Sequence, residues 1–478
     1  MLLKPAKVAR EGSKKREFRS PLPTFCTDAT GCTEFAEEPT LWTLIAARTL
    51  QGFGGGIALP LGTAMLYAAF PPEERGNALG TFGIALVVAL ALGPILGGWL
   101  VDLGHWRWIF FINIPIGIVG VTLGSLWLRE QRRGNETRFD PLGLLFSTVG
   151  FGAVLYAASI AADKGWSSPN VVVGFIVGVV ALIIFALVEL FVAAEPLLDL
   201  RLFAKPIFTL AAITGYVSTV ALFGAEFLMP LYLQVLRGRT ALQAGLLLLP
   251  LAIASAFVSP FAGRLYDKFG PRPLATLGFG LLAINTWQLS QLTTTTSIAW
   301  IQFLLALRGI ALGLTVQTTL TTALSVVPGR QTARGSALIN ATRQVIQSIG
   351  VAILATVLAT AVAPGVSAQL QQFQAAAPKT QEGATPIELC TLQPAAAGAA
   401  PTSNTVPAQA YPTIQSFCGQ YVTGLRNAYH LTFFAALLAT LLGATLPGWP
   451  FTWTGRASLT PRGPAESTAD VTSVGPAH

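Results

Sequence analysis

The sequence predicts an all-α polytopic membrane protein with a bundle of about eleven transmembrane helices, each about 20 residues long. Only 11% of the 478 residues are charged and 52% are hydrophobic. A soluble domain usually has about 25% charged residues. Apolar runs recur from residue 41 to residue 449, so they are not a single membrane anchor. This sequence lacks the charged residues that a soluble protein of the same length needs to cover its surface.

Each predicted helix is an apolar run bounded by Gly, Pro or charged residues. The predicted spans are 41–69, 78–101, 107–128, 141–162, 170–193, 207–233, 241–263, 273–292, 298–326, 336–363 and 426–447. They are apolar on all sides, as expected for helices that contact lipid and one another.

Lys and Arg are concentrated in alternate loops, which predicts the orientation of the bundle. The basic loops are 70–77, 129–140, 194–206, 264–272, 327–335 and the tail 448–478. This set is expected to be cytoplasmic, which places the segment 364–425 outside. Residues 1–40 form a polar basic tail without an apolar signal-peptide core, and their charge opposes the outside location that eleven spans would give them.

The segment 364–425 is rich in Ala, Gln, Pro and Thr and shows no helical periodicity. It is predicted to be a long external loop. Cys390 and Cys418 lie in this segment, where an oxidising compartment would allow a disulfide or leave two free thiols. The other cysteines, Cys26 and Cys32, belong to the N-terminal tail, and no CxxC metal spacing occurs.

Two stretches of the chain repeat. LQGFGGGIALP at 50–60 matches LRGIALGLTVQ at 307–317, and RGNAL at 75–79 matches RGSAL at 334–338. Two homologous halves around a central site are typical of secondary transporters. Chance similarity between Gly- and Leu-rich helices is the alternative. In a repeat beginning at the sixth span, the first two spans would be helices four and five of the N-terminal half, whose first three helices would be lacking.

Three motifs, taken together in this order and spacing, resemble those of the major facilitator superfamily. Arg48-x-x-Gln51-Gly52-x-Gly54 resembles motif B, Gly93-Pro94-x-x-Gly97-Gly98 resembles the antiporter motif C, and the loop after the seventh span resembles motif A. That loop reads Gly263, Arg264, Asp267, Lys268, Phe269, Gly270, Pro271 and Arg272 at the matching positions. With WRWIFFINIPIG at 106–117, the set is similar to the fourteen-helix drug:proton antiporter group of the EmrB/QacA type.

The resemblance implies roles for these motifs. Arg48, costly in an apolar helix, would face the bundle interior and take part in proton coupling, unless it extends to the interface. Gly93 and Gly97 would let a neighbouring helix approach closely, and Pro94 would kink its helix. Asp267 would pair with neighbouring bases and a helix N-terminus as a cytoplasmic latch, unless this loop only sets topology.

Glu226 is the carboxylate that lies well inside an apolar stretch of the second half. An intramembrane carboxylate predicts proton or cation binding, and the alternative is a hydrated position near the outer end. Glu189 lies closer to the inner end, in one of the two linker helices. Further polar residues are expected to line the cavity or to hydrogen-bond between helices: Gln51, Arg308, Gln317, Asn340, Arg343, Gln344 and Gln347.

Several classes of protein are not indicated by the sequence. The basic residues, +8 net, form no stripe of the kind that binds nucleic acid. No GxxxxGK[ST] loop for ATP and no HExxH motif occurs, and His105, His430 and His478 are isolated. Neither an enzyme nor a cofactor is predicted; the energy source is expected to be a proton gradient.

The predicted organisation is a tail at 1–40, an N-terminal remnant at 41–128, two linker helices at 141–193, a six-helix half at 207–447 and a cytoplasmic tail at 448–478. The predicted function is proton-coupled efflux of amphipathic small molecules from the cell membrane by alternating access. Two alternatives are a truncated, transport-incompetent fragment and, with less support, a membrane sensor on a transporter scaffold. The partners are the substrate, protons and the lipid bilayer, with a periplasmic adaptor left open.

Overall fold

The computed structural model describes residues 41–71, 74–105, 108–127, 140–193, 196–363 and 411–448, with positions 366, 390, 393–394 and 405–406. The tails 1–40 and 449–478 and most of 364–410 lie outside these residues. The chain divides into two compact units: residues 1–54 with 378–380, and the remainder. The second unit contains nearly all of the described helices.

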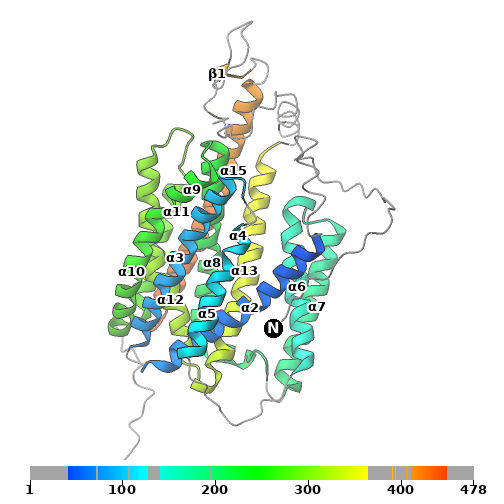
Figure 1. The fold of residues 1–478 in the computed structure, drawn as a ribbon, viewed down its shortest axis with the longest axis vertical. Coiled ribbons are helices and arrows are strands. Elements are labelled where there is room, and N and C mark those ends of the chain that lie inside the picture. Colours follow the sequence, from blue (N-terminus) through cyan, green and yellow to red (C-terminus); the bar gives the residue numbers. More distant parts are fainter. Residues whose placement is uncertain are drawn as a thin grey trace, which may run out of the picture. The chain divides into compact units, whose positions relative to one another are not determined.

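Each of the eleven predicted apolar runs is helical over most of its described residues (Figure 1). The first four runs form α2 (Leu41–Ala69), α3 (Arg75–Asp102), α4 and α5 (Trp108–Phe111 and Asn113–Trp127), and α6 (Pro141–Lys164). The next three form α7 with the π-turn η2 (Pro169–Leu187, Val188–Val192), α8 with the π-turn η4 (Pro206–Leu231, Tyr232–Leu236), and α9 with α10 (Ala241–Leu247, Leu249–Phe269). The last four form α11 (Pro271–Leu289), α12 (Ile298–Ser325), α13 (Thr332–Ala361) and α15 (Tyr411–Ala444).

Nine segments within the described part of the chain are long and apolar enough to cross a membrane. The helices α2 and α11 form where spans were predicted but are not among these nine. The all-α membrane fold is therefore confirmed. Short 3₁₀ turns at Leu200–Ala204 (η3) and Gly329–Gln331 (η5) precede α8 and α13, and a two-residue parallel pair joins β1 (Gln393–Pro394) to β2 (Thr405–Val406).

The prediction of an external loop through residue 425 is wrong at its C-terminal end. Residues 411–425 are helical and form the first turns of the 34-residue helix α15. Ile414, Cys418, Tyr421 and Leu425 are buried along this stretch at spacings of four and three residues, which is one face of a helix. Gln, Ser and Thr on the other face lowered the mean hydropathy and concealed this periodicity.

Short-range signals explain where several helices begin. The side chain of Asp140 accepts a hydrogen bond from the Gly143 amide (2.8 Å) and caps α6, and Ser297 caps α12 in the same way. Thr240 and Gln243 form a capping box at the start of α9. Such caps satisfy N–H groups that the first turn of a helix leaves without partners.

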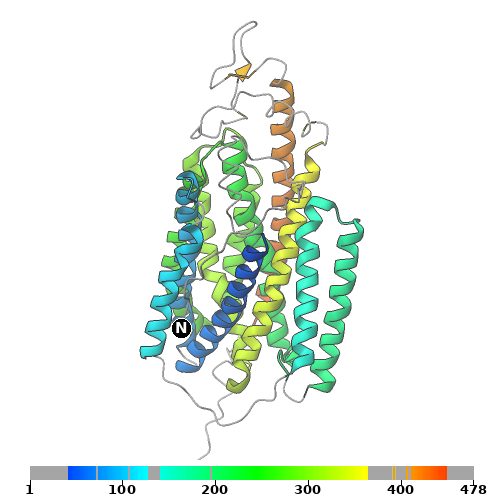
Figure 2. The same cartoon turned by 45° about the vertical axis from the view of Figure 1, so that its right-hand side comes forward.

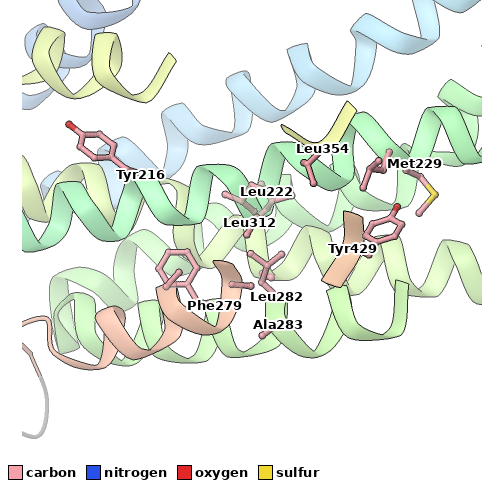
Figure 3. Packing of buried hydrophobic residues seen from close by; sticks show 14 of the residues in the cluster. Tyr216, Leu222, Met229, Phe279, Leu282, Ala283, Leu312, Leu354 and Tyr429 are labelled. Carbon is pink, nitrogen blue, oxygen red and sulfur yellow. The ribbon is translucent and has the colours of Figure 1, made fainter. Parts of the chain in front are cut away.

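The core of the larger unit is formed by α8, α11, α12, α13 and α15. Helix α8 packs against α12, α13 and α15, and α11 packs against α12 and α15. Fully buried side chains such as Leu222, Phe279 and Tyr429 meet between these helices (Figure 3). The linker helices α6 and α7 pack on each other, and α6 also packs along α13 (Figure 2).

Helix α3 joins the first predicted half to the second, because it packs along α9 and α10. The contact uses one stripe of small residues, and a Cβ at Gly80 would stand 2.6 Å from the Ser259 carbonyl oxygen. A Cβ at Gly98 would stand 2.6 Å from the backbone of Ala241 and Leu242. The two backbones therefore touch, as small residues allow in membrane bundles.

The predicted close approach at Gly93 and Gly97 is wrong among the residues that the structure describes. A Cβ at either position would meet no atom within 4 Å. The reason is helical phase: Gly76, Gly80, Gly83, Pro94 and Gly98 follow one another at heptad-like spacing, and Gly93 and Gly97 are turned about 100° away from that stripe.

Cys390 and Cys418 form a disulfide with a Cα–Cα distance of 5.8 Å. The bond ties residue 390 to the first turns of α15. Of the two states left open by the sequence, the structure therefore has the bonded one.

The seam between α3 and α9 gives the first prediction. Replacement of Gly98 by Val is expected to destabilise the protein by about 1–3 kcal/mol, because overpacking forces two backbones apart. Gly97→Val is the matched control, since its side chain would enter open space. Thermal unfolding of the two variants in detergent measures the difference. Equal melting temperatures would contradict the seam.

Candidate functional site

A cavity of about 160 Å³ lies where α3 meets the second half. Its wall includes Val87 and Pro94 from α3, Met229 and Pro230 from α8, and Leu251 from α10. The wall is mostly apolar, which suits amphipathic ligands. Pro94, expected to kink α3, lies in the cavity wall at the seam.

Two charged side chains, Glu226 from α8 and Arg308 from α12, line this cavity. The guanidinium of Arg308 is 1% exposed and donates from Nη2 to the carbonyl oxygens of Ala221 and Leu222, both at 2.8 Å. Arg308 therefore binds the turn of α8 that precedes Glu226. Its Nε has no hydrogen-bond partner in the described part of the chain.

Arg343 of α13 is the second cation near Glu226. Among the described residues, Arg308 and Arg343 act electrostatically on this carboxylate. The Nε of Arg343 donates to Thr219 Oγ1 (3.1 Å), and its guanidinium lies 5.7 Å from the centroid of the Phe223 ring. Both bases are thus attached to α8, one from α12 and one from α13. Their positive charges favour the ionised form of Glu226, and burial opposes it.

A larger cavity, of about 290 Å³, lies beside the disulfide and is lined by residues such as Thr293, Tyr411 and Gln415. None of the described residues that line it is charged. The smaller cavity is the candidate transport site because it carries a carboxylate and an arginine and is bounded by both predicted halves.

The other predicted cavity residues lie elsewhere. Gln317 of α12 faces α3, where its Cγ would be 3.4 Å from a Cβ at Gly83. Asn340 donates to the Ser336 carbonyl oxygen of its own helix (2.8 Å), Gln344 is exposed, and Gln347 is half-buried. None of these side chains, nor Arg343, lines the 160 Å³ cavity. Their predicted roles stay predictions.

Arg48 and Gln51 lie on α2 in the smaller unit. The Nη1 of Arg48 donates to Oε1 of Gln51 at 2.8 Å, so two predicted motif residues are hydrogen-bonded to each other. Their spacing of three residues places them on one face of the helix. The role of Arg48 in proton coupling stays a prediction.

The last turns of α10 contact the N-terminus of α3. Oxygens of Asp267 accept hydrogen bonds from the Gly76 amide (2.8 Å) and the Asn77 amide (2.9 Å). Arg264 donates to the Asn77 side chain (3.3 Å), and Gly263 lies directly against the Gly76 carbonyl oxygen. A carboxylate at a helix N-terminus is favoured by the helix dipole.

Other residues of this motif lie at the turn between α10 and α11. Gly270 adopts a φ of 80°, which favours glycine, and it separates α10 from α11. The ammonium group of Lys268 lies 5.2 Å from the Phe269 ring centroid. Arg272 lies in the first turn of α11 next to Gly448. The predicted latch is therefore built around Asp267, which bonds directly to the other half.

A similar contact at the opposite end of α3 was not predicted from the sequence. Oδ2 of Asp102, the last residue of α3, accepts from the Leu242 amide at 3.2 Å in the first turn of α9. The 28 residues of α3 span about 42 Å, so the two carboxylates act at opposite ends of the seam. A carboxylate at the C-terminus of a helix interacts unfavourably with the dipole of that helix. Its position there indicates that it interacts with a neighbouring helix.

The family of the chain can now be stated. A model of the Major Facilitator Superfamily matches residues 23–351. The chain belongs to the Major Facilitator Superfamily. The resemblance inferred from the motifs is confirmed at this level, and the protein is a multi-pass protein of the cell membrane. Members of this superfamily are transporters and not enzymes.

Individual relatives include drug-resistance proteins. The chain is 38% identical over 319 residues to the uncharacterized MFS-type transporter YhcA of Bacillus subtilis (strain 168), covering 67% of this chain and 60% of that protein. It is 34% identical over 323 residues to the lincomycin resistance protein LmrB of the same organism, covering 67% of each. It is 28% identical over 415 residues to a multidrug resistance protein B homolog of Mycobacterium tuberculosis (strain ATCC 25618 / H37Rv), covering 86% and 74%. The chain thus spans about three fifths of the length of YhcA.

The latch at Asp267 gives the second prediction. Asp267→Ala removes two hydrogen bonds, each contributing about 0.5–1.5 kcal/mol, and is expected to open the cytoplasmic end of the seam. A cysteine replacing the buried Ala78 would then react faster with an impermeant maleimide in inside-out vesicles, once Cys26 and Cys32 are replaced by Ser. Lys268→Ala is the control. An unchanged rate in Asp267→Ala would refute the latch.

Proposed function

We propose that this protein exports amphipathic organic molecules from the cell in exchange for protons, by alternating access around Glu226. The observation that carries the proposal is a mostly apolar cavity with one carboxylate, bounded by α3 on one side and by second-half helices on the other. The names of the relatives LmrB and the multidrug resistance protein B homolog support efflux as the direction of transport.

Glu226 is the proposed coupling group. Its carboxylate makes no hydrogen bond among the described residues, so neither oxygen is committed to a structural contact. One carboxylate in an apolar cavity can bind a proton or interact with a polar group of the substrate. If both compete for it, substrate leaves when a proton arrives, which is the minimum requirement for antiport.

Arg308 and Arg343 would position this carboxylate. Because both are attached to α8 from other helices, a change in the charge of Glu226 alters the attraction between α8, α12 and α13. Protonation of Glu226 would in this way change the packing of these three second-half helices.

The two ends of α3 would act as gates. Opening the cavity toward the cytoplasm requires separation of Asp267 from Gly76 and Asn77, and opening it toward the outside requires separation of Asp102 from Leu242. Each bond is therefore present in one open state and broken in the other, so the two bonds together bias the equilibrium between them.

Transport assays test the coupling role. In everted vesicles, Glu226→Gln is expected to abolish the loss of the proton gradient that substrate addition causes, because the amide holds no exchangeable charge. Glu74→Gln, at an exposed position before α3, is the control. The substrates to screen are lincomycin and amphipathic dyes. Gradient-dependent efflux by Glu226→Gln would refute the assignment of Glu226, and absence of efflux by the wild-type protein in the membrane would refute the proposed function.

The outer gate is tested separately. Asp102→Ala is expected to increase the population with α3 and α9 apart, and spin labels at Leu103 and Leu246 would show longer distances. Lys164→Gln, on the exposed end of α6, is the control. A distance distribution identical to that of the parent protein would show that Asp102 does not hold this end closed.

A further inference from the structure

The two linker helices contain a pair of acidic residues that the proposed transport path does not use. Asp140 precedes α6, and Glu189 lies in the π-turn η2 that ends α7. Both are at the end of the hairpin predicted to face the cytoplasm. At the opposite end, Trp166 Nε1 donates to Thr356 Oγ1 of α13 (2.9 Å).

Each carboxylate uses one oxygen for the fold and leaves the other without a partner. Oδ1 of Asp140 accepts from the Gly143 amide (2.8 Å). Oε1 of Glu189 accepts from the amides of Leu197 (3.1 Å) and Leu198 (3.3 Å). Oδ2 of Asp140 and Oε2 of Glu189 are buried and have no hydrogen-bond partner among the residues that the structure describes. A buried acceptor without a donor costs about 1–3 kcal/mol.

The two carboxylates lie on either side of Gly143. A Cβ at Gly143 would contact Oδ2 of Asp140 and stand 3.0 Å from Oε1 of Glu189. The two groups also act electrostatically on each other. Glu189 is only 1% exposed, so water does not screen this interaction well. Two ionised carboxylates in such a place repel each other.

The described charged groups around this pair come from α13 and from the segment between α7 and α8. Arg334 of α13 acts electrostatically on Glu189. Nearby, the buried Asp199 accepts from the Arg201 amide, and the exposed Arg201 donates to the Leu190 carbonyl oxygen. Among the described residues, Arg334 is thus the base that acts on Glu189, while two carboxylates lie on either side of Gly143.

We propose that Asp140 and Glu189 hold one proton between them, as a proton site separate from Glu226. The proton comes from the cytoplasm and resides on one carboxyl oxygen, whose O–H donates to the other carboxylate. This removes the repulsion between two ionised carboxylates and supplies a donor to an acceptor that has none among the described residues. Arg334 lies in the first turn of α13, the helix that also carries Arg343. The charge of the Asp140–Glu189 pair therefore acts at the contact between the linker hairpin and the second half.

Infrared difference spectroscopy of the purified protein tests this site, because a protonated carboxyl has a C=O stretch that a carboxylate lacks. The measurement uses the Glu226→Gln background, so that the proposed transport carboxylate does not contribute. A carboxylic acid band is expected at neutral pH and should disappear at alkaline pH. Adding Glu189→Gln or Asp140→Asn should remove it, and adding Asp102→Asn should not.

Two results would overturn the proposal. The first is the absence of a carboxylic acid band in the Glu226→Gln protein at neutral pH. This is also the result expected if a metal cation binds in place of the proton, and it does not depend on the folding of the pair variants. The second is a band that persists in folded proteins with either change in the pair. Because neither readout requires transport, failure here leaves the proposed function untouched.

Discussion

The backbone contact between α3 and the α9–α10 segment is the constraint on which the candidate site depends. Glycines at 76, 80 and 98 let the helices touch, and Asp267 and Asp102 satisfy amides at the two ends of the contact. Between these ends, α3 contributes Val87 and Pro94 to the cavity. A bulkier seam would move α3 away, and the cavity would lose one wall.

The two arginines near the candidate site each hold another helix against α8. Arg308 binds carbonyl oxygens of α8 beside Glu226, and Arg343 binds the same helix from α13. Without such contacts, a guanidinium among apolar helices would be strongly unfavourable. The linker hairpin differs, because Asp140 and Glu189 lie on either side of Gly143 and each has a buried oxygen without a partner among the described residues. A proton held between them would supply a missing donor.

Several features of the site were predictable from local patterns. Glu226 stood out as a carboxylate in an apolar run, and the motif around Asp267 predicted a contact with a helix N-terminus. Helix boundaries followed from proline, glycine and cap residues, except at α15, where a polar face concealed the buried one. Asp102 was overlooked because its partner, the Leu242 amide, is 140 residues away along the chain.

The sequence by itself determined the membrane-spanning helices, their order and the superfamily, because hydropathy, turn residues and motifs are local properties of the chain. Only the tertiary structure decided that Gly98 and not Gly97 meets α9, that Arg308 and Glu226 share a cavity, and that Asp140 lies beside Glu189. Each of these depends on the rotation of one helix against another. That rotation is set by packing between distant segments, and an apolar sequence contains little information about it.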